Sequence, residues 1–356
     1  MQTNKSQILE RFENKLKVNL SLGEGNTTVE DKPFNNLSFL GELANNFPKT
    51  ILFKREDSNP TGSFKDRSIC YELSHKLSSG VYDFAIASSG NAGISSCEYL
   101  SKNIEKLKSL NHKITLKVFV SERLHEEKIT KLKSYSNMSA LEVLSIEINT
   151  SEKPTSNCIK YSNESGAFNL RGSDDDNAII GYLAIGEEIA NLDFDSIFTT
   201  TSSGTSAIGI YLGYLMTKYP EVFKDINSEE FILSDYISKL ILIPNTPLPK
   251  LYICQTGKIH PIAKDFDKSF EESTSSLITC VVDRIAKRKE DLIKIIWTTK
   301  GSGLVLSDKD INDAMGILSD NEVKLPLNST CAFSGLIKSV KQGNILKRPL
   351  IIVTGN

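Results

Sequence analysis

The chain has 356 residues, a length typical of about two domains and ample for a continuous hydrophobic core. Hydrophobic residues make up 39% of it and charged residues 24%, which is typical of a globular protein. The 42 basic and 44 acidic side chains give a net charge of −2. Because binding nucleic acid through bulk charge needs a basic excess, this composition argues against a nucleic-acid partner.

Residues 1–19 carry scattered charges and no apolar core, so they predict neither a secretory signal nor a membrane anchor. The longest apolar runs, 240–243 and 350–353, are far too short to cross a membrane. The six cysteines and four histidines are dispersed along the chain, without a C-x-x-C or H-x-x-x-H pair. We therefore expect reduced thiols, no metal site and a cytoplasmic location.

Short runs of apolar and β-branched residues alternate with stretches long enough for helices, and apolar residues at helical spacing predict helices over 66–78 and 178–192. This alternation predicts an α/β fold with two doubly wound domains and mostly parallel sheets. The polar stretch 150–177 predicts a domain crossing or an ordinary surface loop. We expect strands at 81–87, 114–120, 141–148, 196–201, 251–255, 293–297 and 349–354.

The most informative stretch is 54–68, KREDSNPTGSFKDRS. Residues 59–62 (NPTG) predict a turn, and Ser63 is placed to cap a helix whose first turn contains Lys65. The positive end of the helix dipole disfavours the ammonium form of that lysine. A free amine there suits Schiff-base chemistry, while a solvated surface lysine fits the local sequence as well.

Two turns rich in serine and glycine each follow a predicted strand. The first, residues 87–96 (ASSGNAGISS), lies at the carboxyl end of its strand, where open α/β sheets bind ligands. Its backbone N–H groups and hydroxyls suit a carboxylate or a phosphate. The second, residues 199–209 (TTTSSGTSAIG), repeats the arrangement after another strand. A capped tight turn without a ligand would explain either one alone.

Taken in this order, the NPTGSFKDR block, the SSGNAG block, the second turn and the final VTGN resemble pyridoxal-phosphate enzymes of fold type II, the tryptophan synthase beta-like group. The motifs are most similar to those of threonine synthase, which also carries a block like residues 21–27 (SLGEGNT). The resemblance implies a large pyridoxal-phosphate-binding domain from residues 1–75 and 186–356. A smaller α/β domain, residues 76–185, would be inserted in it.

The resemblance also implies roles for individual residues. Lys65 would bind the cofactor, pyridoxal 5'-phosphate, as a Schiff base and then move protons at the substrate. Asn91 would contact the ring hydroxyl oxygen of the cofactor, and Thr354 would face its pyridine nitrogen. The residues expected around the cofactor phosphate are Ser202, Ser203, Gly204, Thr205 and Ser206. Those expected around the substrate are Ser88, Ser89, Gly90, Asn91 and Ala92, with Lys54 as a candidate for a substrate phosphate.

A threonine synthase-like enzyme, a carbon–oxygen lyase of amino-acid biosynthesis, would convert O-phospho-L-homoserine and water to L-threonine and phosphate. It would do so by γ-elimination and β-addition of water. The alternative is β-elimination or β-replacement on serine, threonine or an O-activated serine, as in an ammonia-lyase or a cysteine synthase. A hydroxyl such as that of Thr354 cannot stabilise a protonated pyridine, which favours prompt loss of a leaving group over long-lived carbanions.

Departures from the family pattern bear on the substrate. Ser202 and Ser203 stand where the family is usually richer in glycine, and Leu325-Pro326 stands where many members have Glu-Pro. Arg171 is a second candidate for a substrate phosphate, although residues 174–176, all aspartate, would oppose an anion there. A surface ion pair would explain Arg171 or Lys54 equally well.

These departures leave a non-catalytic, cofactor-binding protein as an alternative of a different class. A Ser63–Lys65 hydrolase is excluded because residues two apart at the start of a helix point in different directions. We expect a small amino-acid substrate and a homodimer.

Overall fold

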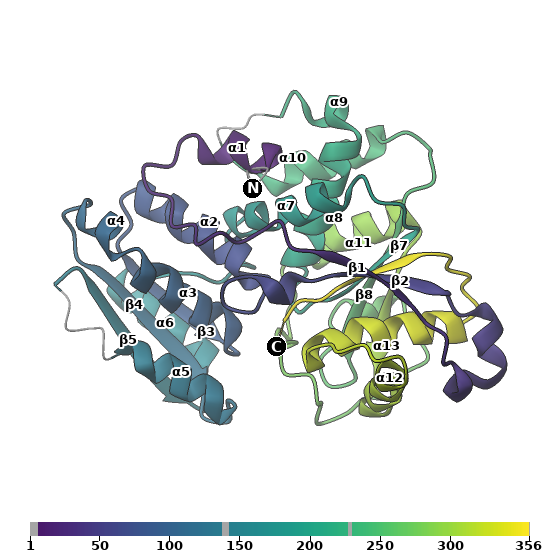
Figure 1. The fold of residues 1–356 in the computed structure, drawn as a ribbon. Coiled ribbons are helices and arrows are strands. Elements are labelled where there is room, and N and C mark those ends of the chain that lie inside the picture. The colour runs from purple at the N-terminus through teal and green to yellow at the C-terminus, as the bar shows by residue number, and fades with distance from the viewer. Residues whose placement is uncertain (1–5, 137–141, 227–229, 356) are drawn as a thin grey trace.

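The computed structural model describes residues 6–136, 142–226 and 230–355, which form two α/β lobes, each built on its own sheet (Figure 1). The larger sheet has the strand order β1-β2-β10-β7-β8-β9, and every neighbouring pair is parallel except β1 with β2. The smaller sheet has the order β5-β4-β3-β6 and is parallel throughout. The predicted α/β fold with two mostly parallel sheets is confirmed.

The elements have the following bounds. The larger sheet contains β1 (Val29–Pro33), β2 (Thr50–Lys54), β7 (Ser196–Thr200), β8 (Lys250–Thr256), β9 (Ser302–Leu306) and β10 (Pro349–Ile352). The smaller sheet contains β3 (Asp83–Ser88), β4 (Ile114–Ser121), β5 (Leu144–Ser151) and β6 (Phe168–Asn169). The α-helices are α1 (Gln7–Glu13), α2 (Lys65–Ser78), α3 (Asn91–Lys102), α4 (Ile104–Lys108), α5 (Glu126–Ser136), α6 (Pro154–Ser165), α7 (Asn177–Ile189), α8 (Thr205–Lys218), α9 (Pro220–Phe223), α10 (Leu233–Ser238), α11 (Lys289–Thr299), α12 (Asp308–Asp320) and α13 (Leu327–Lys341).

Two sequence expectations about these elements are wrong. The apolar run 293–297, expected as a strand, lies inside α11, where acidic residues in the first turn suit a helix start and one face packs against the larger sheet. The stretch 150–177, expected as a crossing or a loop, contains α6 and β6. The strand expected at 141–148 begins at Leu144, and Leu141 lies outside the described residues. Four strands, β1, β2, β6 and β9, were not predicted.

The smaller sheet is built between residues 83 and 169, and the larger sheet takes its strands from both sides of that segment. Helix α2 lies between the two lobes (Figure 1). Its Ile69 and Leu73 pack into the core of the smaller lobe, whereas Tyr71 packs into that of the larger lobe. The domain boundaries at 75/76 and 185/186 stay predictions, because this shared helix spans the first of them.

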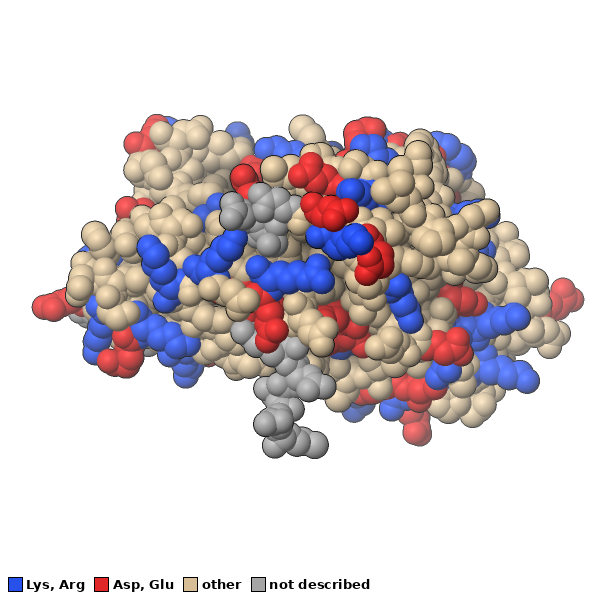
Figure 2. Space-filling model, turned by 90° about the horizontal axis from the view of Figure 1, so that it is seen from above, with Lys and Arg blue, Asp and Glu red and all other residues tan. Residues whose placement is uncertain are grey.

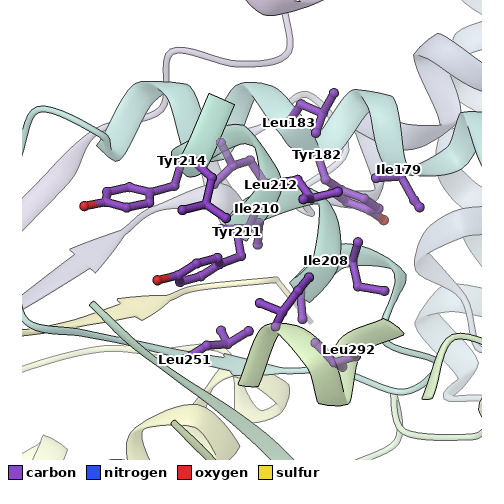
Figure 3. Packing of buried hydrophobic residues seen from close by; sticks show 14 of the residues in the cluster. Ile179, Tyr182, Leu183, Ile208, Ile210, Tyr211, Leu212, Tyr214, Leu251 and Leu292 are labelled. Atoms are coloured by element: carbon purple, nitrogen blue, oxygen red, sulfur yellow. The ribbon is translucent and has the colours of Figure 1, made fainter. Parts of the chain in front are cut away.

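Helices cover both faces of the larger sheet because its strands alternate their apolar side chains between the faces. Leu251 and Ile253 of β8 pack with α7, α8 and α11, and Figure 3 shows Leu251 beneath this cluster. Tyr252 and Cys254 of the same strand pack with α12 and α13 on the opposite face. The smaller sheet is covered by α2, α3 and α5 on one face and by α6 on the other.

Helices α7 and α8 lie against each other with their backbones in contact. A Cβ atom at Gly213 would lie 1.9 Å from the carbonyl oxygen of Leu183, and one at Gly186 would lie 2.1 Å from that of Ile210. Only glycine permits this approach, since any side chain would force the helices apart. Figure 3 shows the aromatic and aliphatic residues that flank the contact, among them Tyr182 and Tyr211.

The surface agrees with the balanced composition. Figure 2 shows basic and acidic side chains interspersed over one face of the molecule. All six cysteines are free of disulfide bonds. Among the described residues, no helix is long and apolar enough to cross a membrane.

A buried cluster of ion pairs joins β2, α2 and α7. The guanidinium of Arg67 donates to Glu56 at 2.6 and 2.7 Å and to Glu188 at 2.6 Å. The ammonium of Lys54 binds the other oxygen of Glu188 and donates to the backbone oxygen of Thr27 at 2.6 Å. Lys54, Glu56 and Arg67 are at most 4% exposed. Such a cluster is stable only while every charge has its partner.

We expect Glu188→Gln to destabilise the protein at neutral pH by about 3 kcal/mol, because it leaves two buried cations short of a partner. Burial alone would raise the pKa of Glu188, but Arg67 and Lys54 outweigh it and hold the pKa at about 2, below its ordinary value of 4.5. A carboxyl with a depressed pKa stabilises the fold above its unfolded pKa and loses that contribution as the pH falls. Urea unfolding should therefore show the gap between wild type and variant closing between about pH 4.5 and pH 2. A gap that stays constant over this range would contradict the assignment.

Candidate active site

A cavity of about 1170 Å³, open solvent at its mouth included, lies between the two lobes at the carboxyl ends of β3, β7 and β10. Three helices begin at this cavity: α2 with Lys65, α3 with Asn91 and α8 with Thr205. The first N–H groups of a helix lack partners within it, and the helix dipole adds positive potential. The cavity is thus suited to an anionic ligand by its backbone alone.

Lys65 is the first residue of α2, and the turn before it is attached to the C-terminal segment. The hydroxyl of Ser63 donates to the backbone oxygen of Thr354 at 3.0 Å and accepts the N–H of Lys65 at 3.3 Å. Ser63 also pairs with Gly355 in an antiparallel bridge. The cap position itself is occupied by Phe64, so Ser63 supports the helix start from one residue further back than expected.

The amine of Lys65 lies among aromatic rings, with its Nζ 5.0 Å from the centre of the Phe64 ring and 5.8 Å from that of Tyr182. Burial lowers the pKa of Lys65, but a hydrogen bond and charge interaction with Tyr182, together with Cys280 and Asp283, raise it above the ordinary value. This corrects the expectation from the helix dipole that the free amine is favoured. The ammonium form is stabilised until a ligand takes the nitrogen.

The turn before α3 is organised by Ser88. Its hydroxyl oxygen accepts the N–H groups of Gly90 and Gly93, each at 3.0 Å. Gly90 has φ +125°, a conformation that side-chain-bearing residues rarely adopt. The amide of Asn91 donates to Ser63 at 3.3 Å and accepts from Lys128 at 2.8 Å. Ser88 is therefore engaged in shaping the turn, and Asn91 joins it to the lysine turn.

In the turn before α8, too, several hydroxyl groups form hydrogen bonds within the protein. The N–H of Gly204 donates to the Thr201 hydroxyl at 3.2 Å, and the Thr205 hydroxyl donates to the backbone oxygen of Gly172 at 3.2 Å. Ser203 and Thr205 share a hydrogen bond at 3.0 Å. Arg288, buried behind the turn, donates to Thr205 at 3.2 Å and pairs with Asp176.

A loop that sequence reasoning missed closes one side of the cavity. The hydroxyl oxygen of Ser202 accepts the N–H of Asp283 at 2.8 Å and that of Val282 at 2.9 Å. The amide oxygen of Asn328 accepts the N–H of Thr279 at 3.0 Å and that of Cys280 at 3.3 Å. These contacts bring Cys280 and Asp283 to the cavity wall. No local motif signals them, because the loop is positioned by residues distant in sequence.

The predicted site residues are mostly brought together. Gly90 and Gly204 are the cap residues of α3 and α8. Lys54 is the exception: it does not line the cavity, and its ammonium is bound within the buried cluster, which corrects its expected role at a substrate phosphate. Arg171 lines the cavity but pairs with Asp283 at 3.0 Å. The predicted residues that line the cavity are Lys65, Ser88, Ser89, Asn91, Ala92, Ser202, Ser203, Thr205, Ser206 and Thr354.

A model of a family described as pyridoxal-phosphate dependent enzymes matches residues 20–355. The chain belongs to this family. Pyridoxal phosphate is therefore its cofactor, and the residues at the cavity fit that molecule. Lys65 offers the amine, the turn before α8 offers N–H groups and hydroxyls for the phosphate, and Thr354 borders the same space. Among curated proteins no sequence matches the chain.

Solved structures with low sequence identity share the fold. A pyridoxal 5'-phosphate-dependent aspartate racemase is 16% identical, with a TM-score of 0.67 and coverage of 98% of this chain and 94% of its own. Threonine deaminase isoform 2 from Solanum lycopersicum is 15% identical, with a TM-score of 0.60 and coverage of 91% of this chain and 83% of its own. An O-acetylserine-dependent cystathionine beta-synthase from Helicobacter pylori is 17% identical, with a TM-score of 0.63 and coverage of 93% of both chains.

Glu72, two helical turns after Lys65, borders the cavity without a hydrogen-bond partner for either carboxyl oxygen. It is 1% exposed. Burial and the nearby Asp175 raise its pKa to about 8, against the opposing effect of Lys76, Arg288 and Lys65. Lys76 and Arg288 already pair with Asp175 and Asp176. Glu72 is thus a neutral acid at physiological pH.

Replacing Glu72 with Gln should stabilise the protein increasingly as the pH rises. In wild type the unfolded state ionises above about pH 4.5 while the folded state stays neutral up to about pH 8. Because each unit of pKa shift is worth about 1.4 kcal/mol, the variant should gain up to about 5 kcal/mol over wild type across this interval. Urea unfolding of both proteins from pH 4 to pH 9 measures the gain. A difference that does not change with pH would show that Glu72 is ionised in the fold.

Proposed function

We propose that the protein catalyses β-elimination or β-replacement on serine, threonine or an O-activated serine. The observation that carries the proposal is the charge of the cavity wall. Among the described residues that line it, the basic side chains are Lys65, which the cofactor engages, and Arg171, which Asp283 already neutralises. Asp283 is occupied by the same ion pair and Glu72 is a neutral acid, so apart from Lys65 the described lining residues leave no unpaired cation for a substrate phosphate. Such a wall accepts a small neutral side chain more readily than a phosphate ester.

The names of the structural relatives support the same reading. One is a deaminase of threonine, and another takes O-acetylserine as a substrate. The aspartate racemase supports only the shared first step, removal of the proton from the α-carbon. O-Phosphohomoserine, the substrate inferred from the resemblance to threonine synthase, remains the second candidate, although neither Lys54 nor Arg171 is free to bind its phosphate.

In this mechanism the cofactor supplies the electron sink that acidifies the α-carbon of the substrate. Lys65 would hold the cofactor through its Nζ, and as a free amine it would take the proton from the α-carbon as a general base. Tyr182 lies beside that nitrogen and would restrict its movement. The hydroxyl of Thr354 stands at the cavity wall as a neutral group, which favours rapid departure of the β-substituent.

The two turns would divide the anionic groups between them. The N–H groups at the start of α8, with the hydroxyls of Ser203 and Ser206, would hold the cofactor phosphate. Those at the start of α3, at Asn91 and Ala92, would hold the substrate carboxylate. Asn91 would also contact the ring hydroxyl oxygen of the cofactor. Each anion then meets N–H dipoles that the fold has already aligned, so binding needs little reorganisation.

The purified holoenzyme should release ammonia and a keto acid from serine or threonine, or replace the acetate of O-acetylserine with a thiol at the β-carbon. Inorganic phosphate should not appear when O-phosphohomoserine is supplied. Coupled assays for the keto acid, ammonia, acetate and phosphate separate these outcomes. Phosphate release together with threonine formation would replace the proposal with the threonine synthase reading.

Lys65→Ala should lower turnover roughly 10²–10⁴-fold by removing the base and the point of attachment. Borohydride reduction of wild type should fix the cofactor to a peptide containing Lys65, and mass spectrometry of a digest would locate it. Lys300→Ala, at the exposed end of α11, is a matched control and should leave both results unchanged. Cofactor fixed to another lysine would contradict the assignment, and absence of turnover on every amino acid would favour a non-catalytic protein.

A further inference from the structure

Lys128 contacts a residue of the ligand cavity from a helix to which the motifs assign no function. It lies in the first turn of α5, and its Nζ donates to the amide oxygen of Asn91 at 2.8 Å. The side chain is half-buried. Asn91 is the first residue of α3 and lines the cavity. A charged donor therefore binds directly to a residue of the site.

The path of this side chain depends on the glycine at the turn. A Cβ atom built on Gly90 would lie 2.6 Å from Cδ of Lys128 and 3.3 Å from its Nζ. The aliphatic part of Lys128 thus packs against the backbone at Gly90, where a side chain would clash, and its ammonium group then reaches Asn91. Such a fitted path distinguishes Lys128 from a solvated surface lysine, whose stem would contact no turn.

The contact also determines how the Asn91 amide is oriented. An ammonium group has donors and no acceptor, so it can bind only the oxygen of the amide. The amide nitrogen then points the other way, where it donates to Ser63 at 3.3 Å. That direction leads to the lysine turn, since Ser63 binds the N–H of Lys65. Lys128 thereby presents the amide nitrogen of Asn91 to the part of the cavity that contains Lys65.

Lys128 shares a titratable neighbour with Lys65. Burial lowers the pKa of Lys128, and the thiol of Cys280, which lines the cavity, acts in the other direction. Burial raises the pKa of Cys280 to about 11, while Lys65 and Lys128 both oppose the rise. One thiol therefore interacts with both amines. The hydrogen bond to Asn91 adds a direct contact between Lys128 and the cavity lining.

We propose that Lys128 is a positioning residue for the cofactor: it fixes the Asn91 amide and adds a positive charge next to the residue that would bind the ring hydroxyl oxygen. The inference depends on the proposed placement of Asn91 at that oxygen. A nearby cation favours loss of a proton from any acid group, and its removal has the opposite effect. A purely structural lysine would change how much cofactor is bound without changing how the bound cofactor titrates.

The test is a pH titration of the visible absorption of the bound cofactor in the holoenzyme, without substrate. For Lys128→Met the midpoint should move to higher pH by about one unit, and Lys128→Arg should restore it to within a few tenths of a unit. Lys131→Met, an exposed position on the same helix, is the matched control and should titrate as wild type. A Lys128→Met midpoint equal to that of wild type would overturn the proposal.

A double-mutant cycle covers the case in which Lys128→Met retains too little cofactor to titrate. Dissociation constants of pyridoxal phosphate are measured for wild type, Lys128→Met, Asn91→Ala and the double variant. If Lys128 acts through Asn91, its replacement should weaken binding about tenfold in wild type and little in the Asn91→Ala background. Equal effects in both backgrounds would overturn the proposal. Neither measurement involves turnover, so failure of the proposed reaction would leave the result unaffected.

Discussion

The attachment of α2 to its surroundings is the constraint on which the site depends. Arg67, in the first turn of that helix, binds Glu56, which follows β2 in the chain, and Glu188 at the end of α7. The position of Lys65, two residues earlier, follows from these pairs, because the first turn cannot rotate without breaking them. If one ion pair of the buried cluster breaks, the remaining charge stays buried without a partner, which costs free energy. The cluster therefore tolerates little movement.

This constraint extends to the other end of the chain. The backbone oxygen of Thr354 accepts hydrogen bonds from the Ser63 hydroxyl at 3.0 Å and from the Phe64 N–H at 3.2 Å. The C-terminal strand β10 lies between β2 and β7. Thr354, two residues after the end of this strand, therefore lies beside the lysine turn. Figure 1 shows the C-terminus between the two lobes. The wall of the cavity is thus built from segments nearly 300 residues apart, 291 for Ser63 and Thr354.

The site offers anions backbone N–H groups without an excess of basic residues. Helices α2, α3 and α8 supply N–H groups, and the cations near them are mostly paired: Arg171 with Asp283, and Arg288 with Asp176. This explains how a protein with a net charge of −2 holds a phosphorylated cofactor. Several hydroxyl groups that the sequence suggested as ligand contacts form hydrogen bonds with the backbone instead. Ser202 is the clearest example, because its oxygen accepts a backbone N–H from the loop that contains Asp283.

The sequence by itself determined the family, the doubly wound fold and the residues of the three turns that meet at the cavity. Local order was sufficient because a strand followed by a Ser- or Gly-rich turn and a helix places that turn at the ligand-binding edge of a sheet. The tertiary structure decided which charges are available. Lys54 belongs to a buried cluster, Glu72 is a neutral acid and Lys128 reaches Asn91, each through partners distant in sequence. Burial and pairing set the charge and reach of a side chain, and both depend on contacts that no local pattern contains.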